Sequence, residues 1–208
     1  MILSKNICYY VNEMKSLKTE FKLSAVDISH FPNTRFPEVA FSGRSNVGKS
    51  SLLNNIVGNR KAAKTSSTPG KTQQINFFFV EDKWMFADLP GFGYAKVSRE
   101  EREKWLKLNM TYLQDRDQLK IVFLLIDSRH EPMDSDIGMM EWLENNEKNF
   151  AIILTKCDKI SKNMVQERLE QIKALLANCK HVIDVIPHSS ETGLGRENII
   201  GMIRRICG

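Results

Sequence analysis

The stretch from Gly43 to Ser50, Gly-Arg-Ser-Asn-Val-Gly-Lys-Ser, is the most informative part of this sequence. It fits the pattern G-x-x-x-x-G-K-[ST], in which two glycines let the backbone wrap closely around a polyphosphate. Successive N–H groups then point inward, and a following helix adds its positive N-terminal end. Lys49 is expected to reach the β- and γ-phosphates, and the Ser50 hydroxyl to bind Mg²⁺. The stretch therefore predicts a phosphate-binding loop to which all its residues contribute: Gly43, Arg44, Ser45, Asn46, Val47, Gly48, Lys49 and Ser50.

The residues around this loop have the pattern that such a loop needs. An apolar run over 38–42 suits a buried strand, and apolar residues recur at helical spacing over 49–57, before Gly58. The same criteria predict strands over 21–26, 75–80, 84–87, 121–126, 151–154 and 182–186, and helices over about 98–114, 134–147, 162–177 and 195–206. Strands that alternate with helices predict an α/β fold with a mostly parallel sheet and helices on both faces.

Composition limits the class of protein. The 208 residues are enough for one well-packed domain, which we expect over 21–208 after an N-terminal arm over 1–20. The net charge of +5 is too moderate to identify a nucleic-acid partner. The four cysteines form no C-x-x-C pair, which is typical of free thiols in a reducing compartment. No apolar run reaches the roughly 18–20 residues of a membrane span, and no secretory signal is evident. We therefore expect a cytoplasmic protein with no membrane partner.

A second candidate motif, Asp88-Leu89-Pro90-Gly91, directly follows the predicted strand over 84–87. A D-x-x-G match alone carries almost no weight, because about one per chain is expected from composition. Its position at a strand end, after the phosphate loop, is where a P-loop nucleotidase has its Walker-B carboxylate near Mg²⁺. Asp88 is therefore a candidate metal ligand, and Gly91 can offer its N–H to a γ-phosphate. The alternative is a Pro-Gly turn in which Asp88 only caps a turn or helix.

A third motif, Thr155-Lys-Cys-Asp158, follows the strand over 151–154 and fits [NT]-K-x-D. The Asp158 carboxylate can accept hydrogen bonds from the N1–H and N2–H₂ groups of guanine, a donor pair that adenine lacks. The stem of Lys156 would lie over the base. After the last strand, Ser189 and Ser190 stand where guanine-binding folds place a loop that contacts guanine O6 through backbone N–H groups. These residues together predict a guanine site.

Four longer stretches, 43–51, 66–73, 88–97 and 127–132, resemble the YihA/YsxC/EngB family of bacterial GTP-binding proteins, and the similarity covers about residues 18–206. The resemblance implies a Ras-like P-loop GTPase domain that binds GTP and GDP with Mg²⁺. It also implies a role in assembly of the large (50S) ribosomal subunit, and a need for the protein in normal cell division and septation. We expect the partner to be that subunit or its rRNA, and the protein to be a monomer.

The resemblance also chooses among three threonines in the long polar segment over 58–73. It selects Thr72 as the second hydroxyl ligand of Mg²⁺, with Gly70, Lys71 and Gln73 beside it, whereas the chemistry alone leaves Thr65 and Thr68 as rivals. Loss of these contacts on hydrolysis would release the segment, which is an order–disorder switch.

The residue after Gly91 bears on the rate of hydrolysis. Ras places a water-orienting Gln there, and this chain has Phe92, which cannot orient water. We therefore predict slow intrinsic hydrolysis. In related GTPases an Asn at the position of Asn46 supports a K⁺ ion beside the phosphates. Asn46 is thus a candidate K⁺ ligand, and a loop residue that bonds only its own backbone is the alternative.

Basic residues gather in two segments around these motifs. One group is Arg60, Lys61, Lys64 and Lys71, and the other is Lys96, Arg99, Arg102, Lys104 and Lys107. The first group could contact rRNA phosphates or be a solvated surface. The second group, in which glutamates interleave, is typical of a solvated helix face. Two other functions stay open: a P-loop ATPase or kinase, which would lack guanine selection, and a GTP-binding scaffold without useful turnover.

Overall fold

The computed structural model describes residues 16–59, 74–92 and 99–208, without the side chains of residues 99, 101 and 102. In these residues a seven-stranded sheet has the order β1-β3-β4-β2-β5-β6-β7. Its strands are β1 (Thr19–Ala25), β2 (Glu38–Gly43), β3 (Ile75–Val80), β4 (Trp84–Asp88), β5 (Leu119–Asp127), β6 (Phe150–Thr155) and β7 (Val182–Pro187). β3 is antiparallel to β1 and β4, and the other neighbouring strands are parallel. The predicted α/β fold with a mostly parallel sheet is confirmed.

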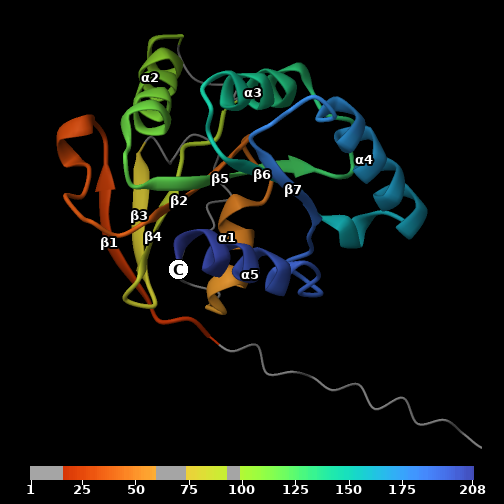
Figure 1. The fold of residues 1–208 in the computed structure, drawn as a ribbon, viewed down its shortest axis with the longest axis horizontal. Helices are drawn as coiled ribbons and strands as arrows, with labels where there is room; N and C mark the ends of the chain where they lie inside the picture. The colour runs from red at the N-terminus through yellow and green to blue at the C-terminus, as the bar shows by residue number, and fades with distance from the viewer. Residues whose placement is uncertain (1–15, 60–73, 93–98) are drawn as a thin grey trace, which may run out of the picture.

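Helices cover both faces of the sheet (Figure 1). They are α1 (Lys49–Val57), α2 (Arg99–Asp115), α3 (Asp134–Asn145), α4 (Lys162–Leu175) and α5 (Arg196–Cys207), with short 3₁₀ helices over Ile28–His30 and Cys157–Lys159. One core cluster joins the sheet to α1 and α5, and the other joins it to α2, α3 and α4. In β5, Phe123 belongs to the first cluster and its neighbours Val122 and Leu124 to the second. The continuous apolar run of β5 is therefore buried on both faces, as a central parallel strand requires.

Element ends differ from the predictions by one or two residues. β1 occupies 19–25 and not 21–26, because its register with β3 begins at the pair Thr19 and Val80. α3 and α4 each end two residues before the predicted positions, at Asn145 and Leu175. These ends depend on tertiary pairing and on local capping, which the periodicity of a sequence does not report.

Two further expectations can be checked in the described ranges. Cys157, Cys179 and Cys207 are free thiols. None of the described helices is both long enough and apolar enough to cross a membrane. The expected division into an arm and a single domain stays a prediction, since residues 1–15 lie outside the described residues.

Candidate functional site

The phosphate loop connects the end of β2 to the start of α1, at the carboxyl edge of the parallel strands. Gly43 has a φ of 152°, and a Cβ there would lie 2.8 Å from the main-chain oxygen of Leu125 in β5. Gly48, the N-cap of α1, has a left-handed φ of 110° and makes no side-chain cap, so the first N–H groups of α1 face the loop. Asn46 also adopts a left-handed conformation, with a φ of 62°. The two glycines are thus required by the backbone, as the phosphate-loop pattern predicts.

Lys49 and Asp88 form a charged pair of groups beside this loop. Burial lowers the pKa of Lys49 below its ordinary value, and the nearby Asp88 carboxylate opposes that shift. Burial raises the pKa of Asp88, whereas the charge of Lys49 and a hydrogen bond from Asn76 lower it. Polyphosphate near Lys49 and a cation near Asp88 would each favour the ionised form of the side chain.

The donor set at this place fits Mg²⁺. Asp88 is 6% exposed, and its Oδ1 atom is buried without a hydrogen-bond partner in the described part of the chain. An orphaned buried carboxylate oxygen is costly unless a cation or donor satisfies it. Ser50, the second residue of α1, carries the hydroxyl that is expected to bind Mg²⁺. Oxygen ligands of these two types, completed by phosphates and water, are those that Mg²⁺ prefers.

The segment after Asp88 lies directly on the phosphate loop. The N–H of Phe92 donates to the oxygen of Gly43 (3.2 Å), and the N–H of Ser45 donates to the oxygen of Phe92 (3.0 Å). A Cβ on Gly91 would lie 3.0 Å from the backbone of Ser45 and 3.2 Å from Lys49 Nζ. Only glycine fits this approach without displacement of the loop. Leu89 and Pro90 complete the segment, and Asn109 Nδ2 of α2 donates to the Pro90 oxygen (3.1 Å).

Thr155 and Lys156 bind the loop from its other side. Thr155 Oγ1 donates to the oxygen of Val47 at 2.7 Å. Lys156 Nζ donates to the oxygen of Asn46 and to Asp127 Oδ2, both at 2.7 Å. Although burial of Asp127 acts in the opposite direction, hydrogen bonds from Arg129 and Lys156 lower the pKa of this carboxylate to about 2. The motif Thr155–Asp158 therefore contacts the phosphate loop through Thr155 and Lys156. It is also part of the predicted guanine site.

Asp158 and Ser189 meet in space although 31 residues separate them. Ser189 Oγ donates to Asp158 Oδ1 at 2.7 Å, and this hydrogen bond lowers the pKa of Asp158 below its ordinary value. Lys159 Nζ lies 3.0 Å from Asp158 Oδ2. The next residue, Ser190, accepts a hydrogen bond from Asn55 Nδ2 through its main-chain oxygen (3.3 Å). The two segments predicted to bind guanine, Thr155–Asp158 and Ser189–Ser190, therefore lie together. The Asp158 carboxylate between them is ionised.

The sequence predicts that His188 is a loop residue that makes hydrogen bonds, but it does not identify Asn55 and Arg196, which support the same two segments. His188 Nε2 pairs with Asn55 Oδ1 at 3.0 Å, and Arg196 donates to the oxygens of Asn55 and Ile56 at the end of α1. Asp127 could have been found, because it follows a buried parallel strand and such strand ends meet at one edge. No local signal marks Asn55 or Arg196, since each is an ordinary helical residue in the sequence.

The expectations for the long polar segment lie outside the described residues. They concern Gly70, Lys71, Thr72 and Gln73, the rival threonines Thr65 and Thr68, and the basic residues Arg60, Lys61 and Lys64. In the second basic group, Lys96 and the side chains of Arg99 and Arg102 also lie outside the described part of the chain. Among the remaining predicted residues, the structure brings the phosphate loop, Asp88–Gly91, Thr155–Asp158 and Ser189–Ser190 to one edge of the sheet.

This fold and this arrangement of motifs define a Ras-like P-loop GTPase domain. A family model described as a 50S ribosome-binding GTPase matches residues 38–156. A protein of Levilactobacillus brevis named a probable GTP-binding protein EngB is 45% identical over 180 residues, which cover 86% of this chain and 91% of the relative. A relative of the same name from Bacillus cytotoxicus is 46% identical over 184 residues, or 88% and 92% of the two chains. The chain belongs to the EngB family of GTP-binding proteins.

Solved structures agree on the fold. The crystal structure of a probable GTP-binding protein engB superposes with a TM-score of 0.66 at 24% identity, over 82% of this chain and 98% of that one. The structure of Era with MgGDPNP and a fragment of 16S ribosomal RNA superposes with a TM-score of 0.67 at 21% identity, over 83% of this chain and 57% of Era. Both likenesses concern the arrangement of helices and strands.

Proposed function

We propose that this protein binds GTP and GDP with Mg²⁺ and hydrolyses GTP slowly, as a switch in assembly of the large ribosomal subunit. The observation that carries guanine binding is the Asp158–Ser189 hydrogen bond, which joins the two segments predicted to contact guanine and lowers the pKa of the carboxylate. Membership of the EngB family supports GTP as the nucleotide and hydrolysis as the reaction.

Different residues of this chain would bind the phosphates and the base of the nucleotide. Lys49 and the N-terminal N–H groups of α1 would bind the β- and γ-phosphates, and Gly91 would offer its N–H to the γ-phosphate. Ser50 and Asp88, with Thr72 as the further proposed ligand, would hold Mg²⁺, which when bound neutralises charge on the transferring phosphoryl group. The N–H of Ser189 already donates to the Leu194 oxygen, so the contact to guanine O6 falls to Ser190 and its neighbours.

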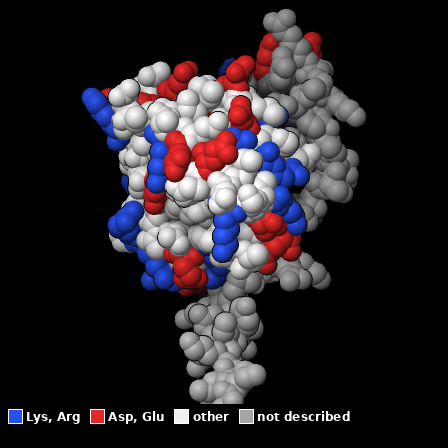
Figure 2. Space-filling view, turned by 90° about the vertical axis from the view of Figure 1, so that its right-hand side faces the viewer, with Lys and Arg blue, Asp and Glu red and all other residues white. Residues whose placement is uncertain are grey.

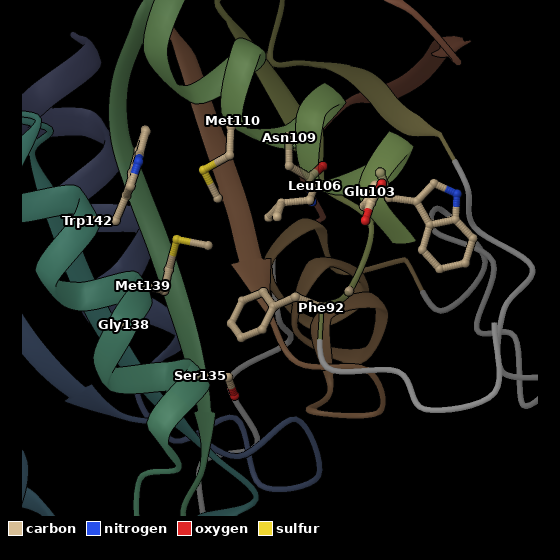
Figure 3. Close-up of a pocket in the computed structure, with 11 residues that line it drawn as sticks. Phe92, Glu103, Leu106, Asn109, Met110, Ser135, Gly138, Met139 and Trp142 are labelled. Atoms are coloured by element: carbon tan, nitrogen blue, oxygen red, sulfur yellow. The ribbon is translucent and has the colours of Figure 1, made fainter. Parts of the chain in front are cut away.

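The proposed slow rate rests on Phe92. Its ring is half-buried against α2 and α3 (Figure 3), and it has no group that could orient water. Asn46 is the proposed K⁺ ligand beside the phosphates, and a bound K⁺ would supply part of the missing charge stabilisation. GTP turnover measured in K⁺ and in Na⁺ at equal ionic strength tests this role. We expect faster turnover in K⁺, and equal rates would remove Asn46 from that role.

Guanine selection is tested by Asp158→Asn, with the exposed Asp117→Asn as a matched control. The carboxylate accepts two hydrogen bonds from guanine, so the variant should lose about tenfold to a hundredfold in GTP affinity and gain affinity for xanthosine triphosphate. The control should bind GTP like the parent. Equal affinity of the parent for ATP and GTP would contradict the proposal and favour a P-loop ATPase or kinase.

The ribosomal role is supported by the description of the matching family model, a 50S ribosome-binding GTPase. A need for the protein in normal cell division and septation is part of the same proposal. On the face drawn in Figure 2, basic and acidic side chains are interspersed, so among its described residues this face has no continuous basic surface. The basic residues over 60–71 are proposed to contact rRNA phosphates, and the exposed Lys104 and Lys107 of α2 belong to a solvated helix face.

Co-sedimentation with large ribosomal subunits, in GTP analogue and in GDP, tests the partner. We expect binding that depends on the nucleotide and falls steeply with salt, since phosphate contacts release counterions. Single-turnover hydrolysis with and without the subunit separates a switch from a scaffold, because a scaffold shows no useful turnover in either case. We also propose that the protein is a cytoplasmic monomer. Size-exclusion chromatography of the full chain would test its oligomeric state.

A further inference from the structure

The loop that follows β7 has one main-chain donor without an acceptor. Within residues 188–194, and among the described part of the chain, the N–H of Ser190 makes no hydrogen bond. Every other N–H of this stretch donates to an oxygen of the protein, namely those of His188, Ser189, Glu191, Thr192, Gly193 and Leu194. Because a backbone N–H is an obligatory donor, that of Ser190 is available to an acceptor on a ligand in place of water.

The side chain of Asn55, in the last turn of α1, holds this loop with both ends of its amide. Its Nδ2 atom donates to the main-chain oxygen of Ser190 at 3.3 Å, and its Oδ1 atom lies 3.0 Å from His188 Nε2. Burial lowers the pKa of His188 to about 4, so the ring is neutral and has a single N–H. Since Oδ1 only accepts, that proton must be on Nε2. Asn55 is 7% exposed, and its amide therefore has one fixed orientation.

Hydrogen bonds fix the peptide groups on both sides of the Ser190 Cα atom. The N–H of Gly193 donates to the oxygen of Ser189 at 2.9 Å, in the peptide group that carries the Ser190 N–H. Asn55 donates to the oxygen of the next peptide group. Loss of the second contact would widen the range of directions open to the Ser190 N–H, because only one of its two neighbouring anchors would remain.

Asn55 is itself held firmly. It belongs to the nine-residue helix α1, which begins at Lys49 beside the phosphate loop. Its main-chain oxygen accepts a hydrogen bond from Arg196 Nε of α5 at 2.7 Å, and α1 and α5 share one core cluster on the same face of the sheet. A group that is supported by rigid elements can direct its neighbours with little loss of entropy on binding. One helix thus begins at the phosphate site and holds the 188–194 loop near its other end.

We propose that Asn55 is a positioning residue for guanine, which directs the Ser190 N–H toward the O6 atom of the base through its contacts with His188 and the Ser190 oxygen. Adenine has an amino donor in place of O6 and cannot accept from this N–H, so the contact contributes to base selection. The inference deepens the proposed function and rests on it, since it concerns how the same site recognises its base.

The test compares GDP with 6-thioguanosine 5′-diphosphate, in which sulfur, a weak acceptor, replaces O6. Both ligands compete with fluorescent GDP for the full chain. We expect the parent to bind GDP about fivefold more tightly than the thio analogue. Asn55→Ala should bind GDP about fivefold less tightly than the parent and should bind the two ligands within about twofold of each other. The exposed helical asparagine of α5 provides the matched control Asn198→Ala, which should keep both affinities.

Two variants of His188 keep the test decisive should Asn55→Ala fail to fold. His188→Phe retains a flat ring but leaves Asn55 Oδ1 without its donor, so the preference for GDP over the thio analogue should fall about twofold. His188→Gln can donate to the same oxygen and should keep the preference of the parent.

The ratio of the two affinities separates positioning from a general structural role. An unchanged ratio in Asn55→Ala, or in His188→Phe if only that variant folds, would overturn the inference, even if both affinities fell by the same factor. Equal binding of GDP and the thio analogue by the parent would also overturn it. Failure of the parent to bind either ligand would instead contradict the proposed function.

Discussion

The ammonium group of Lys156 donates a hydrogen bond to the main-chain oxygen of Asn46, 2.7 Å away. The same ammonium lies 2.7 Å from Asp127 Oδ2, so it joins the phosphate loop to the ends of β5 and β6. A residue of the proposed base site therefore also sets the shape of the phosphate loop. In this chain, recognition of the base and of the phosphates shares a structural support.

Replacement of this support should weaken nucleotide binding more than it weakens folding. Lys156→Met retains much of the apolar stem but loses both charged hydrogen bonds, each worth about 1.5–3 kcal/mol when well shielded. Because the side chain is 27% exposed, we expect about a tenfold loss in GDP affinity, at the low end of that range. Titration with fluorescent GDP measures it. The exposed Lys162→Met is the control, and equal affinities in the two variants would contradict the role.

The hydroxyl of Thr155 should stabilise the protein through its hydrogen bond to the phosphate loop. Thr155→Val is close to isosteric and leaves the buried Val47 oxygen without its 2.7 Å donor, which we expect to cost about 1–3 kcal/mol of unfolding free energy. Thr155→Ser keeps the donor and should keep most of the stability. Urea denaturation of the three proteins compares them. If the Thr155→Val and Thr155→Ser variants were equally stable, loss of the hydrogen bond would not explain the lower stability.

His188 should make stability depend on pH. Burial lowers its pKa to about 4, although the charge of Asp158 acts in the opposite direction. The unfolded chain, with an ordinary histidine pKa, binds more protons between that value and pH 6.5, so stability is present above pH 6.5 and is lost as the pH falls toward 4. From pH 7 to pH 5 the loss should be about 2 kcal/mol.

Urea denaturation at both pH values measures the difference, with His188→Gln as the comparison. Glutamine does not titrate there, so its variant should lose about 2 kcal/mol less stability than the parent over the same interval. An equal pH dependence in both proteins would show that another group titrates. The exposed histidine His130 provides the control variant His130→Gln, whose loss of stability between the two pH values should equal that of the parent.

Arg196 should contribute strongly to stability although it touches no proposed ligand. It is 4% exposed, and its Nε and Nη2 atoms donate to the oxygens of Asn55 and Ile56 at 2.7 and 2.8 Å. Arg196→Lys cannot supply the same planar pair of donors, and we expect a loss of about 2–4 kcal/mol in the free energy of unfolding. The exposed Arg205→Lys on the same helix should change little in the same urea titration.

Much of the framework could be predicted because its signals are local. The glycines at 43 and 48 and the apolar period over 49–57 placed the loop and α1 correctly, and β3 occupies the predicted residues 75–80. Strand and helix periods depend on neighbouring residues, so one sequence displays them. The ends of β1, α3 and α4 were less accurate, because pairing and capping partners decide them.

The class of fold, the phosphate loop and the residue types expected at the base could be predicted from the amino-acid sequence. Which of these residues touch depends on the packing of distant segments. Thr155 reaches Val47 across 108 residues, and Arg196 reaches Asn55 across 141. The same packing makes the side chain of Phe92 line part of a cavity between α2 and α3 (Figure 3). The physical reason is that spacing along the chain encodes local backbone conformation, whereas hydrogen bonds and cavities depend on how distant segments pack.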